Sequence, residues 1–232
     1  MLKKFVPIIA CLVVFALPGF AQETTPEVPK SSDNNSSEKK ANSRPQDPPR
    51  KPEPYDEVAI EKMATKCVQL ATGSGNIILE VYPESAPNTV RNFLNLVAIK
   101  AFDNTTFSRV VPDFVIQGGD LYTNENITND LKWRAVRNIA DEPNLIKHEV
   151  GIVSMARGDE PNSASTAFFI LLTDYDALDG KFAAFGKVTE GLDVVKTINK
   201  MPVEGETPKD PVRITEASVF TCEQQPETPK AN

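Results

Sequence analysis

The sequence predicts a mostly-β domain in which antiparallel strands form a closed barrel and two α-helices cover its open ends. Short apolar runs of the strand type recur between residues 67 and 220, and only two segments of that region show helical spacing. With 40% hydrophobic and 25% charged residues, the 232-residue chain has an ordinary globular composition. Many short strands combined with two helices are typical of such a barrel.

The strand-type segments are short and apolar, and the first two are separated by a tight turn at residues 73–76. We expect strands at residues 67–70, 77–82, 107–116, 151–155, 167–172, 183–188 and 212–220. The first helix is indicated by an apolar stripe at positions i, i+3, i+4 and i+7, formed by Val90, Phe93, Leu94 and Val97. Pro87 suits the first turn of this helix. Residues 191–201 show similar spacing and predict the second helix.

The first 21 residues are typical of a signal peptide. Two lysines (Lys3 and Lys4) precede an apolar stretch over residues 5–20, and Gly19 and Ala21 are the small residues that a signal peptidase needs. An uncleaved membrane anchor is the alternative, but a spanning helix needs ~20 apolar residues, and two prolines interrupt this stretch. Cys11 is a poor lipoprotein acylation site because few apolar residues precede it. We therefore expect export to the periplasm or the extracellular space, without stable membrane insertion after cleavage.

Two further segments contain almost no large apolar residues. Residues 22–63 are rich in Pro, Ser, Asn, Glu and Lys, and residues 223–232 have the same character. Such segments cannot bury enough surface to offset the entropy of ordering, so we expect a disordered linker, a folded domain at residues 64–222 and a disordered tail. Asn34, Asn35, Asn104 and Asn126 lie in Asn-x-Ser/Thr sequons.

The charge excludes one class of function. The formal net charge is -7 and the pI is about 4.9, whereas a nucleic-acid binder normally presents a basic face. The acidic total also disfavours electrostatic attachment to anionic lipid. We expect no nucleic-acid partner.

The most informative run is residues 107–120, FSRVVPDFVIQGGD, in which an arginine and a glutamine stand among apolar residues. Side chains alternate in a strand, so Arg109 and Val111 should share one face while Val110 points to the other. Burying a guanidinium needs strong compensation. The pattern alone leaves open whether Arg109 is only a surface charge and Gln117 only a turn residue.

This run resembles the central motif of the cyclophilins, in which Phe-x-Arg-Val is followed by Phe, an apolar residue and Ile-Gln-Gly-Gly-Asp. Other segments are similar to the same family in the same order: residues 82–87 with Thr89 and Asn92-Phe93, then residues 151–156, 168–170, 178–181 and 185–188. These matches span nearly all of residues 68–220. The lead-in Asn104-Thr105-Thr106-Phe107 and the compact loops resemble bacterial exported members.

The resemblance implies a fold and an activity. The family fold is an eight-stranded antiparallel closed barrel with two helices, and the activity is peptidyl-prolyl cis/trans isomerisation of proline-containing polypeptides without a cofactor. By resemblance, Arg109, Gln117 and Phe114 are catalytic, and the substrate-binding residues are Val115, Ala156, Arg157, Phe169, Leu178 and Phe182. We expect a monomer.

The family fold also brings the first and last strands together. Cys67 and Cys222 would then lie within the ~7 Å between Cα atoms that a disulfide allows. Export to an oxidising compartment would favour their pairing. Two unrelated thiols are the alternative.

Three positions depart from the family pattern. Ala167 stands where many members have glutamine, Ala177 where tryptophan or phenylalanine is usual, and Phe182 where histidine or tyrosine is common. These departures motivate a second hypothesis, a catalytically weak module of the same fold that binds proline-containing segments or a fixed partner. A hollow barrel of the lipocalin kind is disfavoured because Phe93, Phe107, Phe168 and Phe185 look like core filling.

Overall fold

The computed structural model describes residues 51–223. The predicted signal peptide with Cys11, the linker up to residue 50 with Asn34 and Asn35, and the tail from residue 224 lie outside the described residues.

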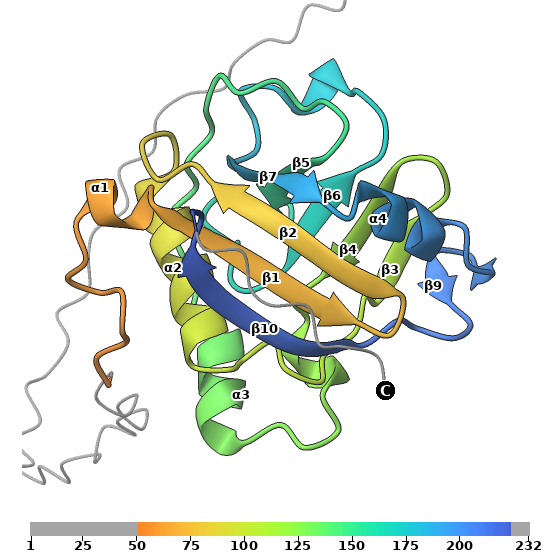
Figure 1. Cartoon of the computed structure of the whole chain (residues 1–232), viewed down its shortest axis with the longest axis horizontal. Coiled ribbons are helices and arrows are strands. Elements are labelled where there is room, and N and C mark those ends of the chain that lie inside the picture. The colour runs from red at the N-terminus through yellow and green to blue at the C-terminus, as the bar shows by residue number, and fades with distance from the viewer. Residues whose placement is uncertain (1–50, 224–232) are drawn as a thin grey trace, which may run out of the picture. The chain divides into compact units, whose positions relative to one another are not determined.

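The domain is built on one eight-stranded antiparallel sheet that curves into a half-barrel (Figure 1). Along the sheet the strand order is β10-β1-β2-β7-β5-β6-β4-β3. The strands of this sheet are β1 (Lys66–Thr72), β2 (Gly75–Val81), β3 (Arg109–Val111), β4 (Val115–Gly118), β5 (Ile152–Met155), β6 (Phe168–Leu171), β7 (Ala184–Glu190) and β10 (Ile214–Thr221). A separate hairpin consists of β8 (Val203–Glu204) and β9 (Thr207–Pro208).

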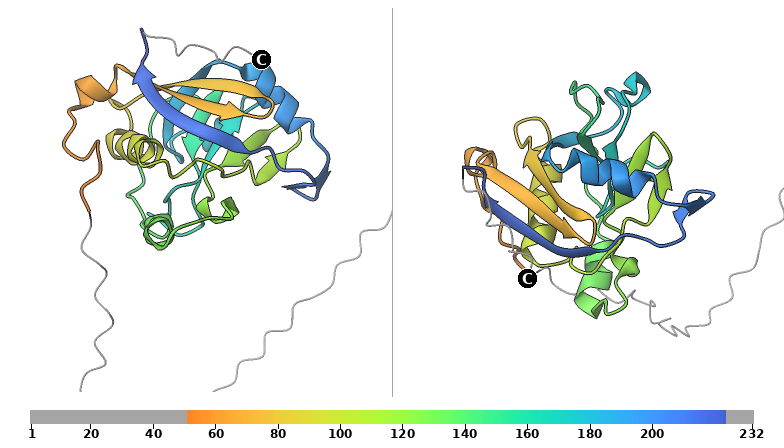
Figure 2. Two further views of the ribbon diagram at one scale, coloured as in Figure 1. Left: turned by 60° about the horizontal axis from the view of Figure 1, so that its bottom comes forward. Right: turned by 45° about the vertical axis from the view of Figure 1, so that its right-hand side comes forward.

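Both predicted helices are present, with two shorter ones. The helices are α1 (Ile60–Met63), α2 (Pro87–Ala98), α3 (Asn129–Ala135) and α4 (Leu192–Asn199), and η1 (Leu121–Thr123) and η2 (Asp176–Leu178) are 3-10 turns. Pro87 occupies the first turn of α2 as expected. Helix α2 packs against β10, and α4 packs against β2, β3 and β4 (Figure 2).

The prediction of a closed barrel was wrong. In the described part of the chain, no strand ladder joins the edge strands β3 and β10; a single bridge links Thr106 with Arg213 just before them. One reason is that residues 107–116 do not form one strand, because Asp113 takes a left-handed φ of 58° and the chain turns between β3 and β4. The other is that the free edge of β3 is occupied, since Val110 N donates to Glu206 O at 2.8 Å.

The interior of the half-barrel is filled with aromatic rings. Phe93 lies with its ring centroid 5.3 Å from that of Phe168 and 4.9 Å from that of Phe185, and Phe107 meets Phe168 edge-on. All four rings are fully buried, as is Phe102. These are the four phenylalanines expected to fill the core, and such packing leaves no room for a ligand cavity of the lipocalin kind.

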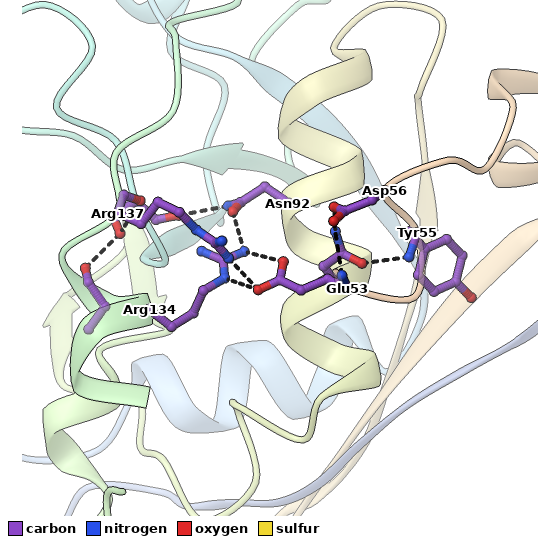
Figure 3. A network of polar contacts seen from close by, with 9 residues as sticks. Glu53, Tyr55, Asp56, Asn92, Arg134 and Arg137 are labelled. Atoms are coloured by element: carbon purple, nitrogen blue, oxygen red, sulfur yellow. Dashed lines mark hydrogen bonds and ion pairs between the residues drawn. The ribbon is translucent and has the colours of Figure 1, made fainter. Parts of the chain in front are cut away.

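Residues 51–58 form a strap that is held against α2 and α3, although the sequence analysis placed them in the linker. Glu53 accepts from Arg134 Nε at 2.8 Å and also pairs with Arg137, and Arg134 donates to Asn92 at 2.6 Å (Figure 3). Tyr55 N donates to Asn95 at 2.6 Å. Polar contacts hold this strap, so its low apolar content did not reveal it. The folded part therefore begins before residue 64.

Cys67 and Cys222 form a disulfide, with their Cα atoms 5.0 Å apart and 155 residues apart in sequence. The register explains the pairing: Lys66 lies opposite Thr221 where β1 meets β10, and Cys222 N donates to Thr65 O at 3.0 Å. The pairing implied by the resemblance is thus confirmed. Within residues 51–223, no helix is both long and apolar enough to cross a membrane.

Candidate active site

Three neighbouring strands place Arg109, Gln117 and Phe169 side by side. Arg109 on β3 lies directly opposite Gln117 on β4, and Gln117 lies directly opposite Phe169 on β6. Residues opposite each other in an antiparallel pair have side chains on the same face. Arg109 Nη1 donates to Gln117 Oε1 at 3.3 Å, and its side chain is 40% exposed. The guanidinium is therefore reachable from solvent, and Gln117 holds it on the face that also carries Phe169.

The same face carries a small apolar cluster that is separate from the main core. Val115 and Leu171, which pair between β4 and β6, are buried here together with Phe169. Phe114, Ala156, Leu178 and Phe182 pack against this cluster and are partly exposed. The apolar residues that the resemblance assigned to substrate binding thus come together, at 114–115, 156, 169, 178 and 182. These residues, called the apolar cup below, pack together on the sheet face that carries Arg109.

Helix α4 holds the turn between β3 and β4 in place through Asn199. Asn199, which is 3% exposed, donates to Val111 O at 2.8 Å and to Val115 O at 3.1 Å, and accepts from Asp113 N at 2.8 Å. This turn carries Phe114. Asn199 was not predicted as a supporting residue, because a single asparagine near a helix end gives no sequence signal.

Ala156 and Arg157 lie at the end of β5, beside the cup. Ala156 N donates to Ala167 O at 3.0 Å. Because this N–H is already bonded, a substrate backbone would bind Ala156 through the carbonyl oxygen. The guanidinium carbon of Arg157 lies 5.0 Å from the centroid of the Phe182 ring, and Phe182 in turn meets Phe169 edge-on at 5.9 Å. The sequence analysis assigned Arg157 to substrate binding, but it did not predict this stacking contact.

The loop that carries Leu178 is tied to the sheet through a buried histidine. The His148 ring lies 3.1 Å from Asp179 Oδ1 and 3.2 Å from Ser154 Oγ, and His148 N donates to Asp179 at 2.9 Å. A hydrogen bond from Lys147 and the amide of His148 lower the pKa of Asp179 to about 2. The carboxylate therefore stays ionised, and keeps these bonds, at any pH well above that value.

One carboxylate beside Arg109 was missed. Arg109 Nε donates to Glu206 Oε2 at 2.6 Å, and this contact lowers the pKa of Glu206. Glu206 lies 97 residues from Arg109 in an exposed turn, and no sequence pattern predicts which residues such a turn brings together.

Glycine is required where the chain leaves β4. Gly119 has a φ of +83°, and a Cβ on it would collide with the carbonyl oxygen of Thr166. A left-handed φ and a close backbone approach both favour glycine. Both conditions hold at residue 119, directly after β4.

Two shallow hollows lie outside the cup. One is lined by Thr89, Ala140, Asp141, Glu142, Met155, Arg157, Ala164, Lys181 and Ala183, and it adjoins the cup through Arg157. The other, of about 170 Å³, lies beside the strap and is lined partly by Glu53, Arg91 and Arg134. Charged groups of both signs line each hollow, so neither resembles the apolar cup.

Comparisons with known proteins agree with this geometry. The family described as cyclophilin type peptidyl-prolyl cis-trans isomerase matches residues 67–219. The chain is 33% identical over 172 residues to a peptidyl-prolyl cis-trans isomerase of Acinetobacter baylyi, covering 70% of this chain and 89% of that protein. It is 38% identical over 152 residues to an isomerase of Schizosaccharomyces pombe, covering 65% and 96%.

A solved structure shows the same fold. A cyclophilin type isomerase of Cryptosporidium parvum superimposes with a TM-score of 0.60 at 27% identity, covering 67% of this chain and 98% of that chain. The same protein was also solved in the presence of the dipeptide Ala-Pro, with a TM-score of 0.59. By sequence and fold, the chain belongs to the cyclophilin family of peptidyl-prolyl cis/trans isomerases.

Proposed function

We propose that this chain accelerates rotation about X-Pro bonds in exported polypeptides, with Arg109 as the catalytic donor. The membership of the family supports the isomerase activity. The observation that carries the role of Arg109 is its position: a half-exposed guanidinium held by Gln117 on the face that bears the apolar cup.

The reaction needs no bond to be made or broken. Rotation about an X-Pro bond faces a barrier of about 18–20 kcal/mol because the amide is conjugated. As the bond twists, the prolyl nitrogen regains a lone pair, and a fixed cationic donor beside it stabilises the twisted state more than either planar state. Arg109 supplies the donor, and the cup of Phe114, Val115, Phe169 and Leu178 holds the proline ring.

The test is a protease-coupled assay on a short X-Pro peptide with the full chain and its Arg109→Ala variant. Losing one preorganised donor should lower kcat/KM by ~10²–10³. Arg109→Lys is the graded control, because it keeps the charge but loses the planar fork. Thermal melting verifies that each variant is folded. Activity like that of the wild type in Arg109→Ala would refute the assigned role.

The alternative is a weakly active module that binds proline-containing segments. Ala167, Ala177 and Phe182 depart from the family pattern, and Ala177 is exposed on η2 next to Leu178. Such a module would bind the peptide without accelerating its isomerisation. The same assay separates the two, because a binder gives no rate increase at micromolar protein.

We further propose that the protein is exported as a monomer of the bacterial exported type, with the first 21 residues acting as its signal peptide. The Cys67–Cys222 disulfide supports an oxidising destination, since such bonds persist outside the reducing cytosol. Mass measurement of the secreted form tests this: a mature protein that begins at Gln22 and has no free thiol is expected. Retention of residues 1–21 would contradict it, and light scattering reports the oligomeric state.

A further inference from the structure

Glu206 contacts the strand that carries Arg109 through both its backbone and its side chain. Its carbonyl accepts from Val110 N at 2.8 Å, and its carboxylate accepts from Arg109 Nε at 2.6 Å. Strand β3 lies at the edge of the sheet, so its outer side has no neighbouring strand within that sheet. Glu206 provides a backbone hydrogen bond to this outer side and also a carboxylate for the side chain of Arg109.

The β8–β9 hairpin fixes where Glu206 lies. Val203 pairs with Pro208 and Glu204 with Thr207, which leaves Gly205 and Glu206 as a two-residue turn. Gly205 has a φ of +64°, and glycine is favoured at the first central position of such turns. Lys209 N donates to Pro202 O at 2.9 Å and closes the base of the hairpin. Glu206 is thus presented by a short, internally bonded element.

Two contacts define the orientation of the guanidinium. The group is planar and its donors have a fixed geometry. Glu206 holds Nε at 2.6 Å, whereas Gln117 holds Nη1 at the longer distance of 3.3 Å. Fixing two of the three nitrogens also fixes the direction of Nη2. If Glu206 were removed, only the longer contact would remain.

We propose that Glu206 is a positioning residue for Arg109, which it aligns for the proline in the apolar cup; this inference rests on the proposed isomerase function. The ion pair is exposed, at 40% for Arg109 and 54% for Glu206, so it contributes little to folding stability. We expect Glu206 to affect the isomerase rate instead, because a small misplacement of a catalytic group removes much of its contribution to the rate.

The experiment is a double-mutant cycle in the full chain, measured by isomerase rate and thermal melting. Glu206→Ala should lower kcat/KM by about tenfold, less than the loss of Arg109 itself. The loss should fall on kcat with KM little changed, because the aligned donor acts on the twisted state. Glu206→Gln should recover part of the rate, since its amide oxygen can still accept from Nε. Glu204→Gln, in the same hairpin, should behave like the wild type.

The second arm combines Glu206→Ala with Arg109→Lys. A lysine carries a single ammonium and no planar fork that Glu206 could align, so removing Glu206 should then change the rate less than twofold. Two results would overturn the role: an unchanged or faster Glu206→Ala variant, or an equal loss in both backgrounds, which would mean that the residue acts through the hairpin alone. An inactive wild-type protein would instead refute the proposed function and this role with it.

Discussion

Phe182 and Arg157 give the cup a wall that differs from the family pattern. Where many members have histidine or tyrosine, the Phe182 ring supports the Arg157 guanidinium 5.0 Å from its centroid and also contacts Phe169 edge-on. A partly exposed contact of this kind contributes about 0.5–1 kcal/mol. Phe182 lacks the polar atoms of a histidine or tyrosine side chain. The guanidinium of Arg157 therefore provides a polar, cationic group at the same edge of the cup.

Ala177, exposed next to Leu178, adds little apolar surface at the rim of the cup, and this predicts weak binding of bulky cyclic-peptide inhibitors such as cyclosporin. In Ala177→Trp, burying about 60 Å² of indole against the inhibitor would contribute about 1.5 kcal/mol, or about tenfold in Kd. Isothermal titration of the two proteins measures it. Ala177→Ser is the matched control, because it adds no apolar surface. Equal affinity for the tryptophan variant and the wild type would show that this rim does not contact the inhibitor.

At the scale of elements, most of the fold could be predicted, and the exceptions have physical causes. The stripe of Val90, Phe93, Leu94 and Val97 is buried on α2 as expected, because an amphipathic pattern reports burial directly. Residues 107–116 were predicted as one strand, since apolar periodicity does not register the left-handed Asp113. Helix α3 was missed because its contacts are largely polar: Thr128 caps it, and Arg134 joins it to Glu53 and Asn92.

The residues of the candidate site also fall into a group that could be predicted from the sequence and a group that could not. The residues of the apolar cup were implied by the resemblance of local motifs to the cyclophilins, and the structure brings those residues together. Asn199 and Glu206 could not be predicted, because they reach the site from residues about 85–100 positions away through single polar contacts.

Helix α4 positions the site through Asn199, which predicts a coupled loss. Asn199→Ala leaves the amide of Asp113 and the carbonyls of Val111 and Val115 without this partner, at a cost of about 1–3 kcal/mol in the free energy of unfolding. The rate should also fall, because the turn that carries Phe114 is loosened. Urea unfolding and the isomerase assay measure the two effects.

Thr197→Ala is the control for Asn199, because the Thr197 hydroxyl donates to Asp193 O within the same helix. It should change neither the rate nor, beyond a few tenths of a kcal/mol, the stability. A stable Asn199→Ala variant with normal activity would show that α4 does not support the turn.

At the scale of the whole domain, the strap makes residues 51–58 part of the folded unit. The Glu53–Arg134 pair is buried, with 9% and 6% of the side chains exposed, while the nearby Lys51–Asp130 pair is 83% and 76% exposed. Removing one partner of a buried pair is costly because the other charge stays buried. An exposed pair contributes little.

This contrast predicts unequal effects of two substitutions in the strap. Glu53→Gln should lower the free energy of unfolding by about 3 kcal/mol. Lys51→Ala should change it by less than about 1 kcal/mol. Urea titration of the two variants measures both values. If the two variants were equally stable, the strap would not be held by Glu53.

The Cys67–Cys222 bond closes a loop that contains almost the entire domain. Replacing both cysteines by serine should lower the free energy of unfolding by about 2–4 kcal/mol, because the unfolded chain regains the freedom that the loop removes. The isomerase rate of the folded variant should be retained, since the bond joins β1 and β10, whereas Arg109 lies on β3 and Val115 and Phe169 of the cup lie on β4 and β6. Unfolding curves of oxidised and reduced wild type should show the same difference, and a loss of rate without a loss of stability would contradict this.

The position of this bond also has a mechanical consequence. Tension that reaches the domain from the chain on either side is transmitted from Cys67 to Cys222 across a covalent link instead of through the hydrogen bonds between β1 and β10. The residues between the two cysteines, about 500 Å of extended polypeptide, are thereby shielded from the load. A force applied on the two sides of this bond therefore leaves Arg109 and its neighbours in place.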